Sequence, residues 1–333
     1  MSISEGVKIS SLKELATLAG VSTAAASNAL SGKGRMSEET RTRIQLLAES
    51  VGYRPNSFAA SLRTGLSKNI GFVMTPDPDP DSEKRWASYS SHLLYELVFE
   101  ASKHGYTVSI ITANMPELLS QLHIDFLYYF DPYPDEVLID EANRLNIPVL
   151  SNDKFGDDRL SINLDSGFEA MTHAALDLLK ERGSMKPGLL TELPVLPSDA
   201  IGEDAYLSWC TNNKVEPRIA RGDWGRTNLH EKVQELVATG CDSIYSYYEE
   251  AEAVLESLRS LGIRVPEDML LVAATSDVNE TDELGVTSTV YHPDAAAATA
   301  MPQMIAHSNS VGLGLETLQL PWELVLRHST QRN

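Results

Sequence analysis

The sequence is poor in the features that mark secreted, metal-rich and membrane-spanning proteins. It contains two cysteines, Cys210 and Cys241, which are too few for a disulfide framework or a cysteine metal cluster. No run reaches the roughly 18 apolar residues that a transmembrane helix needs, and the longest candidate, 295–306, contains Pro302. No basic N-terminus precedes an apolar core. We therefore expect no secretory signal, no membrane association and a cytoplasmic location with reduced thiols.

Motifs for catalysis and for cofactors are also missing. The sequence has no G-x-S-x-G, H-E-x-x-H or C-x-x-C, and Gly312-Leu313-Gly314 lacks the rest of a dinucleotide fingerprint. The basic loop 31–35 lacks the spacing of a phosphate-binding loop. The aspartates of 77–81 alternate without the glycine and glutamate of a calcium loop. We expect no enzyme, no cofactor and no metal.

Negative charge is plentiful, but it is distributed unevenly. The chain has a net charge of −20. Residues 1–68 hold nine basic and five acidic residues, a net charge of +4, so the remainder carries −24. This asymmetry favours a basic, DNA-facing head on an acidic body that repels phosphate, although chance clustering is the alternative.

Two short helices joined by a tight turn are predicted near the N-terminus. Ser11 and Glu14 form a capping box at the start of the first helix, and Gly20 ends it in the left-handed conformation. Ser22 caps a second helix that runs to about Leu30. This is the spacing of a helix-turn-helix, whose second helix enters the DNA major groove. An ordinary helical hairpin has the same local pattern.

A third helix and a short fourth one follow. The third is predicted over 38–51, and three helices make a minimal DNA-binding head. In 53–65, Pro55 suits a first helical position and an apolar stripe includes Leu62. A helix of two turns is marginal alone in water, so DNA or a partner copy would have to order it. The other interpretation is a plain linker.

Beyond residue 68 the patterns of strand and helix alternate. Strands are predicted at 69–75, 107–112, 124–129, 147–150, 186–191, 243–247 and 269–274. Helices are predicted at 90–104, 135–145, 167–182, 199–211, 227–239 and 249–261. Such alternation implies parallel sheets with helices on both faces. We expect an α/β body of two doubly wound units.

Several runs in the head make residues 11–65 resemble the LacI/GalR family of bacterial transcriptional regulators. They are Ala19-Gly20-Val21-Ser22, Ser27, Ser37, Thr40-Arg41, Gly52-Tyr53-Arg54-Pro55-Asn56 and 59–62. The phrases 261–268, 287–293 and 320–327 are similar to that family's regulatory core. The resemblance implies an all-α helix-turn-helix head and a two-lobed, periplasmic-binding-protein-like α/β body.

The resemblance also implies which residues touch DNA. The recognition helix carries Ser22, Thr23, Ala24, Ser27 and Asn28. Contacts to the DNA backbone fall to Leu12, Lys13, Ser37, Thr40, Tyr53 and Asn56. A hinge helix with Ala59, Leu62 and Arg63 enters the minor groove, where Leu62 acts as an apolar wedge. Asn28 stands where the family often has Arg or His, which leaves the operator sequence open.

By the same resemblance we divide the chain into three parts. Residues 1–54 form the DNA-binding domain, 55–67 the hinge helix and linker, and 68–333 the effector and dimerisation domain. The first lobe comprises 68–151 and 292–312, and the second 152–291 and 313–333. The chain is thus expected to cross between lobes near Ser151, near Tyr291 and near residue 312.

The expected ligand cleft departs from the family pattern. The resemblance assigns effector contacts to Thr75, Ala200, Glu249, Thr275 and Asp277. Ala200 replaces an Arg that binds sugar hydroxyls in the family, and Tyr248-Glu249 replaces Asn-Asp. These changes disfavour a sugar. They leave open another metabolite or no ligand.

The sequence therefore predicts a DNA-binding transcriptional repressor. We expect a homodimer that binds a pseudo-palindromic operator in double-stranded DNA, with a small molecule as effector. Two competing classes are a two-lobed small-molecule receptor without a regulatory role and a nucleotide-dependent enzyme of similar topology. The DNA-like head argues against the first, and the missing phosphate loop argues against the second.

Overall fold

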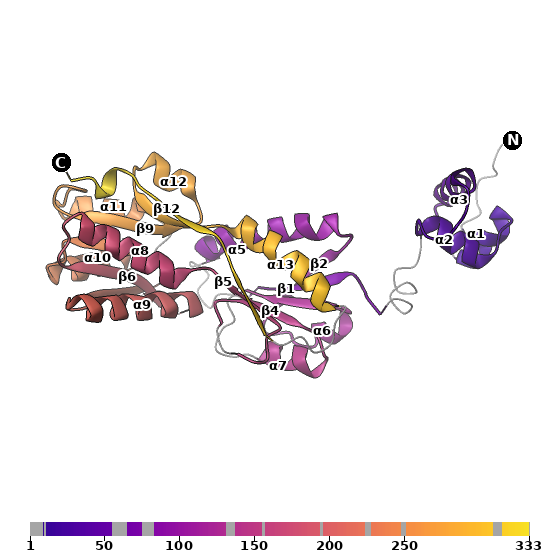
Figure 1. Cartoon of the computed structure of the whole chain (residues 1–333), viewed down its shortest axis with the longest axis horizontal. Helices are drawn as coiled ribbons and strands as arrows, with labels where there is room; N and C mark the ends of the chain where they lie inside the picture. The colour runs from indigo at the N-terminus through magenta and orange to yellow at the C-terminus, as the bar shows by residue number, and fades with distance from the viewer. Residues whose placement is uncertain are drawn as a thin grey trace. The chain divides into compact units, whose positions relative to one another are not determined.

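The computed structural model describes residues 9, 11–54, 65–74, 83–130, 137–154, 157–193, 196–223, 228–247, 251–308 and 315–332. Contacts divide the chain into two compact units, 1–67 and 68–333 (Figure 1). We call them the head and the body and describe each by itself.

The head is a cluster of three helices. They are α1 (Leu12–Ala19), α2 (Thr23–Leu30) and α3 (Glu38–Ser50). Their small core centres on Leu15, Ala29, Ile44 and Ala48, all of which are buried. The three helices coincide with the predicted ones to within a residue at each end, because each begins at a serine that caps it.

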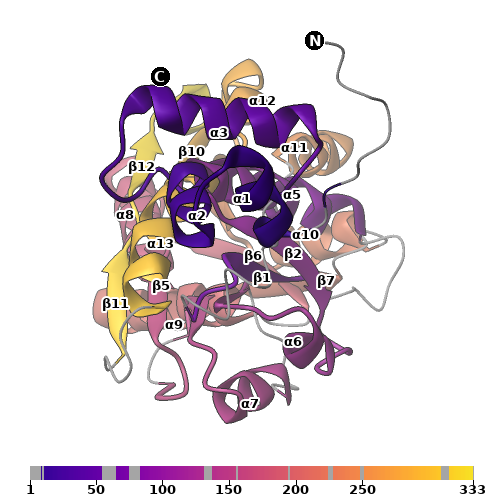
Figure 2. The same cartoon turned by 90° about the vertical axis from the view of Figure 1, so that its right-hand side faces the viewer.

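The first lobe of the body is a six-stranded parallel sheet between two layers of helices. Its strand order is β11-β5-β4-β3-β1-β2. The strands are β1 (Asn69–Met74), β2 (Thr107–Thr112), β3 (Phe126–Tyr129), β4 (Val149–Asn152), β5 (Ile162–Asp165) and β11 (Glu316–Gln319). Helices α5 (Glu83–Lys103) and α13 (Pro293–Ser308) pack together on one face, and α6 (Leu118–Gln121) and α7 (Val137–Arg144) cover the other (Figures 1 and 2).

Alternation along β3 shows how the sequence fills both faces of this sheet. Phe126 and Tyr128 belong to the core under α5 and α13, whereas Leu127 and Tyr129 belong to the core under α6 and α7. All four side chains are buried, so the strand reads as a continuous apolar run.

The second lobe repeats this architecture. Its sheet has the order β12-β10-β9-β8-β6-β7, and only the β10–β12 pair is antiparallel. The strands are β6 (Pro187–Leu193), β7 (Ile219–Asp223), β8 (Ser243–Ser246), β9 (Leu270–Thr275), β10 (Thr287–Tyr291) and β12 (Trp322–Val325).

Helices also cover both faces of the second sheet. On one face lie α8 (Phe168–Glu181) and α9 (Pro197–Asn213). On the other lie α10 (Leu229–Ala238) and α11 (Ala251–Ser260). Short α12 (Val278–Glu283) joins β9 to β10, and a 3-10 turn (His328–Thr330) follows β12. The predicted fold class, a helical head with a body of two doubly wound sheets, is confirmed.

Two of the three crossings between lobes differ from the expected positions. The chain stays in the first sheet through β5, so it crosses after Asp165 rather than near Ser151. It crosses back after Tyr291, as expected, and α13 joins the core of the first lobe. The last crossing follows Gln319 rather than residue 312, because β11 pairs with β5.

Pro321 explains why the last crossing falls where it does. Strands β11 and β12 belong to different sheets, and only Leu320 and Pro321 lie between them. Proline has no N–H for a ladder, which favours a break there. At the first crossing, the added Cβ of an alanine at Gly167 would lie 2.5 Å from Trp322 Cδ1, so the first and third crossings are closely packed.

No helix in the described part of the chain has both the length and the apolar character to span a membrane.

Candidate functional site

In the head, the local sequence sets how α2 is presented. The Ser11 hydroxyl accepts the Glu14 N–H (3.2 Å) and the Glu14 carboxylate accepts the Ser11 N–H (3.3 Å), which fixes the start of α1. Gly20 ends α1 at φ 66°, and Ser22 accepts the Ala25 N–H (3.1 Å) to begin α2. The turn between the helices is therefore only a few residues long and closely defined.

Helix α2 has a buried side and an exposed side. Ala26 and Ala29 are fully buried against the rest of the head. Ser22, Thr23 and Ala24 are exposed at its N-terminal end. Small side chains cover this exposed end, so the backbone of another molecule could approach it closely.

Helix α3 holds the C-terminal ends of the other two helices through its polar side chains. Arg43 donates to the Ala19 carbonyl at the end of α1 (3.1 Å), and Gln45 donates to the Ala29 carbonyl in α2 (3.1 Å). Arg41 donates to the Asn28 carbonyl (3.3 Å). The Ala19 and Ala29 carbonyls lie in the last turns of their helices, where intrahelical donors are lacking, so α3 supplies donors to them. The Asn28 carbonyl also accepts the Lys33 N–H at 3.0 Å. Sequence reasoning missed this role, since only long-range contacts reveal it.

The expected DNA-contacting residues lie in three settings. Lys13, Ser37, Ser22, Thr23 and Ala24 are exposed, and Leu12, Ser27, Asn28 and Thr40 are half-buried. Tyr53 is buried, its ring packing in the core of the head. Asn56, Ala59, Leu62 and Arg63 lie outside the described residues.

Asn28 is restrained by the loop that follows α2. Gly34 has φ 77°, and a Cβ there would lie 2.7 Å from the Asn28 amide nitrogen. Arg41 also donates to the Gly34 carbonyl (3.4 Å). The loop and the Asn28 side chain are therefore placed together, and glycine is required for that approach.

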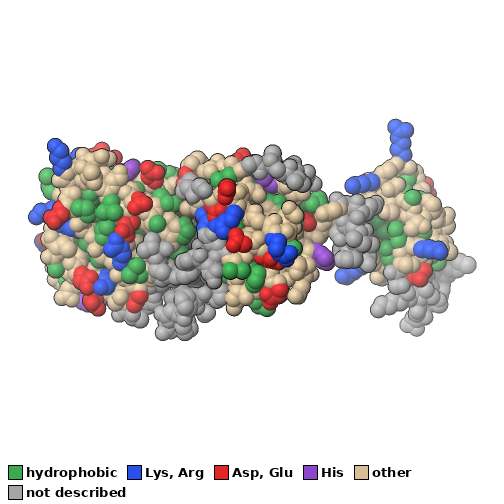
Figure 3. Space-filling view, turned by 90° about the horizontal axis from the view of Figure 1, so that it is seen from below, with side chains coloured by type: hydrophobic (Ala, Val, Ile, Leu, Met, Phe, Trp, Pro, Cys, Tyr) green, Lys and Arg blue, Asp and Glu red, His purple; other side chains and the backbone are tan. Residues whose placement is uncertain are grey.

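The described helices and loops of the head, residues 11–54, carry six basic and four acidic residues, a net charge of +2. Lys13, Lys33, Arg35 and Arg54 are all exposed. Figure 3 shows Lys and Arg side chains at several points on the head, whereas Asp and Glu are frequent on the body. The head thus offers a surface suited to a polyanion.

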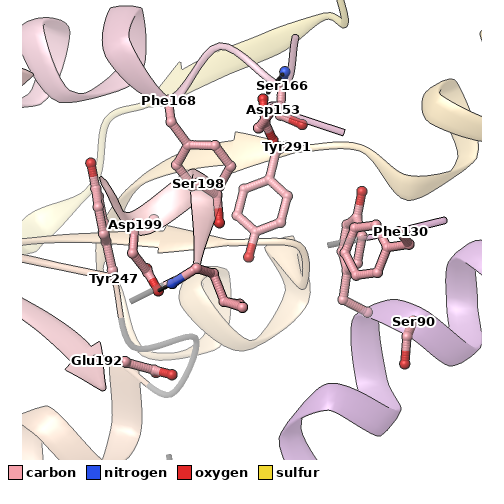
Figure 4. A pocket seen from close by; sticks show the side chains of 13 residues that line it. Ser90, Phe130, Asp153, Ser166, Phe168, Glu192, Ser198, Asp199, Tyr247 and Tyr291 are labelled. Carbon is pink, nitrogen blue, oxygen red and sulfur yellow. Dashed lines mark hydrogen bonds between the residues drawn. The ribbon is translucent and has the colours of Figure 1, made fainter. Parts of the chain in front are cut away.

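The body contains a cleft where the carboxyl ends of both sheets meet. Its volume is about 110 Å³. The described lining is Tyr89, Ser90, Phe130, Asp153, Ser166, Phe168, Glu192, Leu196, Ser198, Asp199, Tyr247, Ala274 and Tyr291. Phe130, Asp153, Ser166 and Tyr247 follow directly on β3, β4, β5 and β8, and Tyr291 ends β10, which is where ligands bind in doubly wound sheets (Figure 4).

Aromatic rings link the two lobes across this cleft. Tyr89 stacks on Phe130 with centroids 5.1 Å apart, and its ring lies 5.4 Å from that of Tyr291. Tyr291 in turn lies 5.5 Å from Phe168, which meets Tyr247 edge-on at 5.8 Å. Figure 4 shows Phe168, Tyr291 and Phe130 around the middle of the cleft, with Asp153 on one side and Asp199 and Glu192 on the other.

Asp153 is the most perturbed carboxylate of the cleft. It is 4% exposed and has φ 53°, a left-handed conformation that few residues other than glycine, asparagine and aspartate adopt. Burial raises its pKa to about 7, opposed by hydrogen bonds from Ser166, whose N–H donates to it at 2.8 Å. The negative charge of Asp165 raises the pKa further.

Tyr247 is anchored on the second lobe by a close approach to α9. A Cβ on Gly202 would lie 1.7 Å from the Tyr247 hydroxyl oxygen, so only glycine fits there. The hydroxyl also shares a hydrogen bond with Thr172. Burial raises the pKa of Tyr247 well above its ordinary value, so the phenol stays neutral. The ring is a fixed wall of the cleft.

The positions expected to bind an effector lie beside the described lining rather than in it. Ala200 is exposed, and its neighbours Ser198 and Asp199 line the cleft in its place. Asp277 is exposed and accepts the Asn279 N–H (3.0 Å) to cap α12, while Thr275 is bonded to the Asp277 backbone. Of the 274–277 segment, Ala274 lines the cleft. Thr75 and Glu249 lie outside the described residues.

Sequence reasoning missed the aromatic lining for a simple reason. Tyr89, Phe130, Phe168 and Tyr291 read as ordinary core residues, and they come from four separate elements. The one available signal is position, since Phe130 and Tyr291 stand at the carboxyl ends of β3 and β10. Among the described residues, no group of three or more His, Cys, Asp or Glu could hold a metal ion.

Comparison with known proteins matches both units. Residues 11–56 match the family model "Bacterial regulatory proteins, lacI family", and residues 176–330 match "Periplasmic binding protein-like domain". The HTH-type transcriptional repressor CytR of Escherichia coli (strain K12) is 25% identical over 346 residues, covering 96% of each chain. The sucrose operon repressor of Streptococcus mutans serotype c is 29% identical over 184 residues, 54% of this chain and 55% of that repressor.

Solved structures share the fold at low identity. The Lac repressor dimer bound to operator and the anti-inducer ONPF has a TM-score of 0.80 at 18% identity, covering 97% of this chain and 99% of that one. The complex of the transcriptional regulator CelR with cellobiose has a TM-score of 0.70 at 18% identity, covering 96% and 99%. The fold of the head and of the two-lobed body is thus shared with a repressor solved with operator DNA and with a regulator solved with cellobiose.

Proposed function

Since this chain belongs to the lacI family of bacterial regulatory proteins, we propose that it is a transcriptional repressor that binds a specific operator as a homodimer. The observation that carries this proposal is the presentation of α2. Its small polar face is exposed, its apolar face is buried, and α3 fixes its C-terminal end. Such a helix can enter a major groove as a rigid body.

The division of labour along the chain follows from this role. We propose residues 1–54 as the DNA-binding domain, 55–67 as the hinge and linker, and 68–333 as the dimerisation and effector domain. The exposed face of α2 reads bases, the flanking residues Lys13, Ser37 and Thr40 hold phosphates, and Leu62 wedges the minor groove. Because its target is chromosomal DNA, we propose that the protein acts in the cytoplasm.

An exposed apolar stripe on the first lobe supplies a surface for the second copy. On α5, Tyr95, Val98 and Phe99 are 67%, 47% and 52% exposed, at the spacing of one helix face. Ile110 on the neighbouring edge strand β2 is 54% exposed. A monomer would leave these side chains in water, so we propose that the stripe packs against its symmetry mate.

Small-molecule control acts through the cleft between the lobes. A ligand changes operator affinity only if it binds one lobe arrangement better than another. Tyr89 and Phe130 on the first lobe meet Tyr291 and Phe168 across the cleft, so a ligand among them would bias how the lobes are set.

The two competing functions fit less well. A two-lobed receptor has no use for the capped helices and exposed basic residues of the head. An enzyme of this size would be expected to carry a recognisable catalytic motif, and the sequence lacks those for hydrolases, metalloproteases and dinucleotide-dependent enzymes. We propose that the chain is not an enzyme.

A gel-shift titration tests the main proposal. The full chain is titrated against DNA from upstream of its own reading frame, with scrambled DNA of equal length as competitor, across a salt series. We expect specific retention and a steep fall in affinity with salt. Binding that scrambled DNA removes as readily as the upstream DNA would contradict sequence-specific regulation, as would no binding at low salt.

Asn28→Ala tests the reading of bases by α2. An asparagine that pairs with adenine contributes about 1–3 kcal/mol of discrimination, so the variant should lose preference at one symmetric position of a selected site. Lys13→Ala is the matched control, because loss of a phosphate contact weakens all sequences alike and lowers the salt slope by about one. Unchanged selectivity in the Asn28 variant would remove that residue from the reading surface.

A further inference from the structure

The charged groups of the cleft have one sign. Its described lining contains Asp153, Asp199 and Glu192 and no Lys, Arg or His. Two described basic side chains have acidic partners, since Arg221 pairs with Glu203 and Lys154 lies 3.6 Å from Asp157. A ligand placed here meets a negative potential that low-dielectric walls strengthen.

The same space is walled by aromatic faces. Four rings (Tyr89, Phe130, Phe168 and Tyr291) form a continuous series with centroids 5.1–5.5 Å apart. The π-face of an aromatic ring attracts a cation within about 6 Å of its centroid, and the attraction grows when both are desolvated. Rings and carboxylates together are complementary to an organic cation.

Two other ligand classes fit this lining less well. A sugar could bond to the hydroxyls and carboxylates of the described lining, but it would leave the negative charge of the three acidic residues without a counter-charge. A divalent metal needs clustered oxygen ligands, and among the described residues no set of three is close enough to hold one. The volume of about 110 Å³ is below the roughly 300–1,000 Å³ of pockets for drug-sized ligands, which favours a compact head group.

We propose that the cleft binds a small organic cation, an amine or quaternary ammonium compound, whose charged head lies among the four rings and is balanced by Asp153 and Asp199. The inference rests on the proposed function, because it names the chemical class of the effector for that site. Asp153 and Asp199 together supply the counter-charge, since both are buried at the cleft and each accepts a backbone N–H, from Ser166 (2.8 Å) and from Leu196 (3.2 Å). Burial raises the pKa of Asp153 to about 7, so the binding experiments are made above that pH, where its carboxylate is ionised.

A pair of probes of equal shape isolates the charge. Choline carries a trimethylammonium group, and 3,3-dimethylbutan-1-ol replaces its nitrogen with carbon at nearly the same volume. Calorimetric titration of the full chain, without DNA, should show saturable one-to-one binding of choline. We expect the neutral alcohol to bind at least about tenfold more weakly, which corresponds to about 1.4 kcal/mol. Tetramethylammonium and putrescine serve as further cations.

Two substitutions separate the carboxylate from the rings. Asp153→Asn should lower the affinity for choline about tenfold and leave the affinity for the neutral alcohol unchanged. A merely structural role of Asp153 would not give this difference. Phe168→Leu keeps an apolar wall but removes a π-face, and it should weaken choline several-fold. Glu256→Gln makes the same charge change on an exposed face of α11 and should leave choline binding as it is. Thermal unfolding of each variant verifies that it folds.

The outcome separates this inference from the proposed function. Equal binding of choline and its neutral isostere overturns the cation proposal, as does failure of all three cations to bind at millimolar concentration. Tighter binding of glucose or cytidine than of any cation also overturns it. Each of these results is compatible with specific retention of upstream DNA, which is measured independently and alone decides the regulatory function.

Discussion

In the head, the residues expected to touch DNA come mostly from one short stretch of chain, whereas the cleft takes its lining from the ends of many separate strands. Consecutive serine caps and α3 hold α2 in place. Its position therefore does not depend on its exposed side chains, which are small. In the cleft, rings from both lobes already pack on one another. Reading a base sequence requires a rigid exposed element, but sensing a metabolite requires contacts that change with the lobe arrangement.

The largest expected effect tests whether dimerisation of the body is needed for tight binding of the operator by the two heads. Phe99→Glu places a charge in the apolar stripe of α5 and should make the protein monomeric. Operator affinity should then fall by at least about a hundredfold, because the second head no longer binds as part of one unit. Sedimentation and gel shift measure the two effects.

Met185→Glu is the control for that variant. Met185 is 72% exposed on the second lobe, away from α5, so the same change there should leave the dimer intact. A monomeric Phe99→Glu protein with full operator affinity would show that the two heads work separately.

A smaller effect is expected at the wall of the cleft. Gly202→Ala forces a methyl group into the Tyr247 hydroxyl, and overpacking of this kind costs about 1–3 kcal/mol of stability. Chemical denaturation measures the loss. Removing the hydroxyl in the double variant Gly202→Ala, Tyr247→Phe should restore part of it. If the two substitutions are strictly additive, the proposed clash is wrong.

The buried carboxylate predicts a dependence on pH. The pKa of Asp153 lies near 7 in the folded protein and near its ordinary value of 3.8 when unfolded. The folded state therefore retains a proton that the unfolded state has released, and the free energy of unfolding falls as pH rises through this interval. Asp153→Asn removes that loss of stability. Near neutral pH the free energy of unfolding of the variant should therefore exceed that of the wild type by on the order of 1–3 kcal/mol.

Denaturation curves across pH test this. The difference in the free energy of unfolding between variant and wild type should vanish toward about pH 4, below which Asp153 is protonated in both the folded and the unfolded state. The neighbouring Asp165 also contributes to the shift, and Ser166 opposes it. A gap that stays constant with pH would assign the effect to packing instead.

The smallest effect concerns the support of α2. Gln45→Ala leaves the Ala29 carbonyl without its side-chain partner, which costs about 1 kcal/mol. Hydrogen exchange on the full chain should show roughly fivefold lower protection in α2. Glu49→Ala, an exposed change on the same helix, is the control. Equal protection in both variants would mean that Gln45 contributes nothing to the placement of α2.

Local signals explain what the sequence predicts well. Ser11, Gly20 and Ser22 fix helix ends through contacts within three or four residues, so α1 and α2 follow from the chain alone. The strands that were missed include β5 and β10, which lie inside their sheets, and two polar edges. Ile219-Ala220-Arg221-Gly222-Asp223 and Glu316-Thr317-Leu318-Gln319 form β7 and β11 at the borders of their sheets. There one side faces solvent and the apolar pattern is weak.

The cleft could not be predicted in the same way. Its lining depends on where the chain crosses between lobes, and two of the three crossings were placed too early. Pairing of β11 with β5 decides the last one, and such long-range pairing leaves no local trace in the sequence. Of the positions that the resemblance to a family assigned, the described ones (Ala200, Thr275 and Asp277) lie within three residues of the lining, but the resemblance gave no sign of the four rings.

The division of β11 and β12 between the two sheets, at Pro321, determines when each lobe can finish folding during synthesis. Each sheet receives one border strand from residues 316–325, and α13 contributes to the first core shortly before them. The head can fold as soon as it leaves the ribosome, because domains form in order of synthesis. Neither lobe is complete until residues 316–325 have emerged, so premature termination leaves a folded DNA reader on two unfinished lobes.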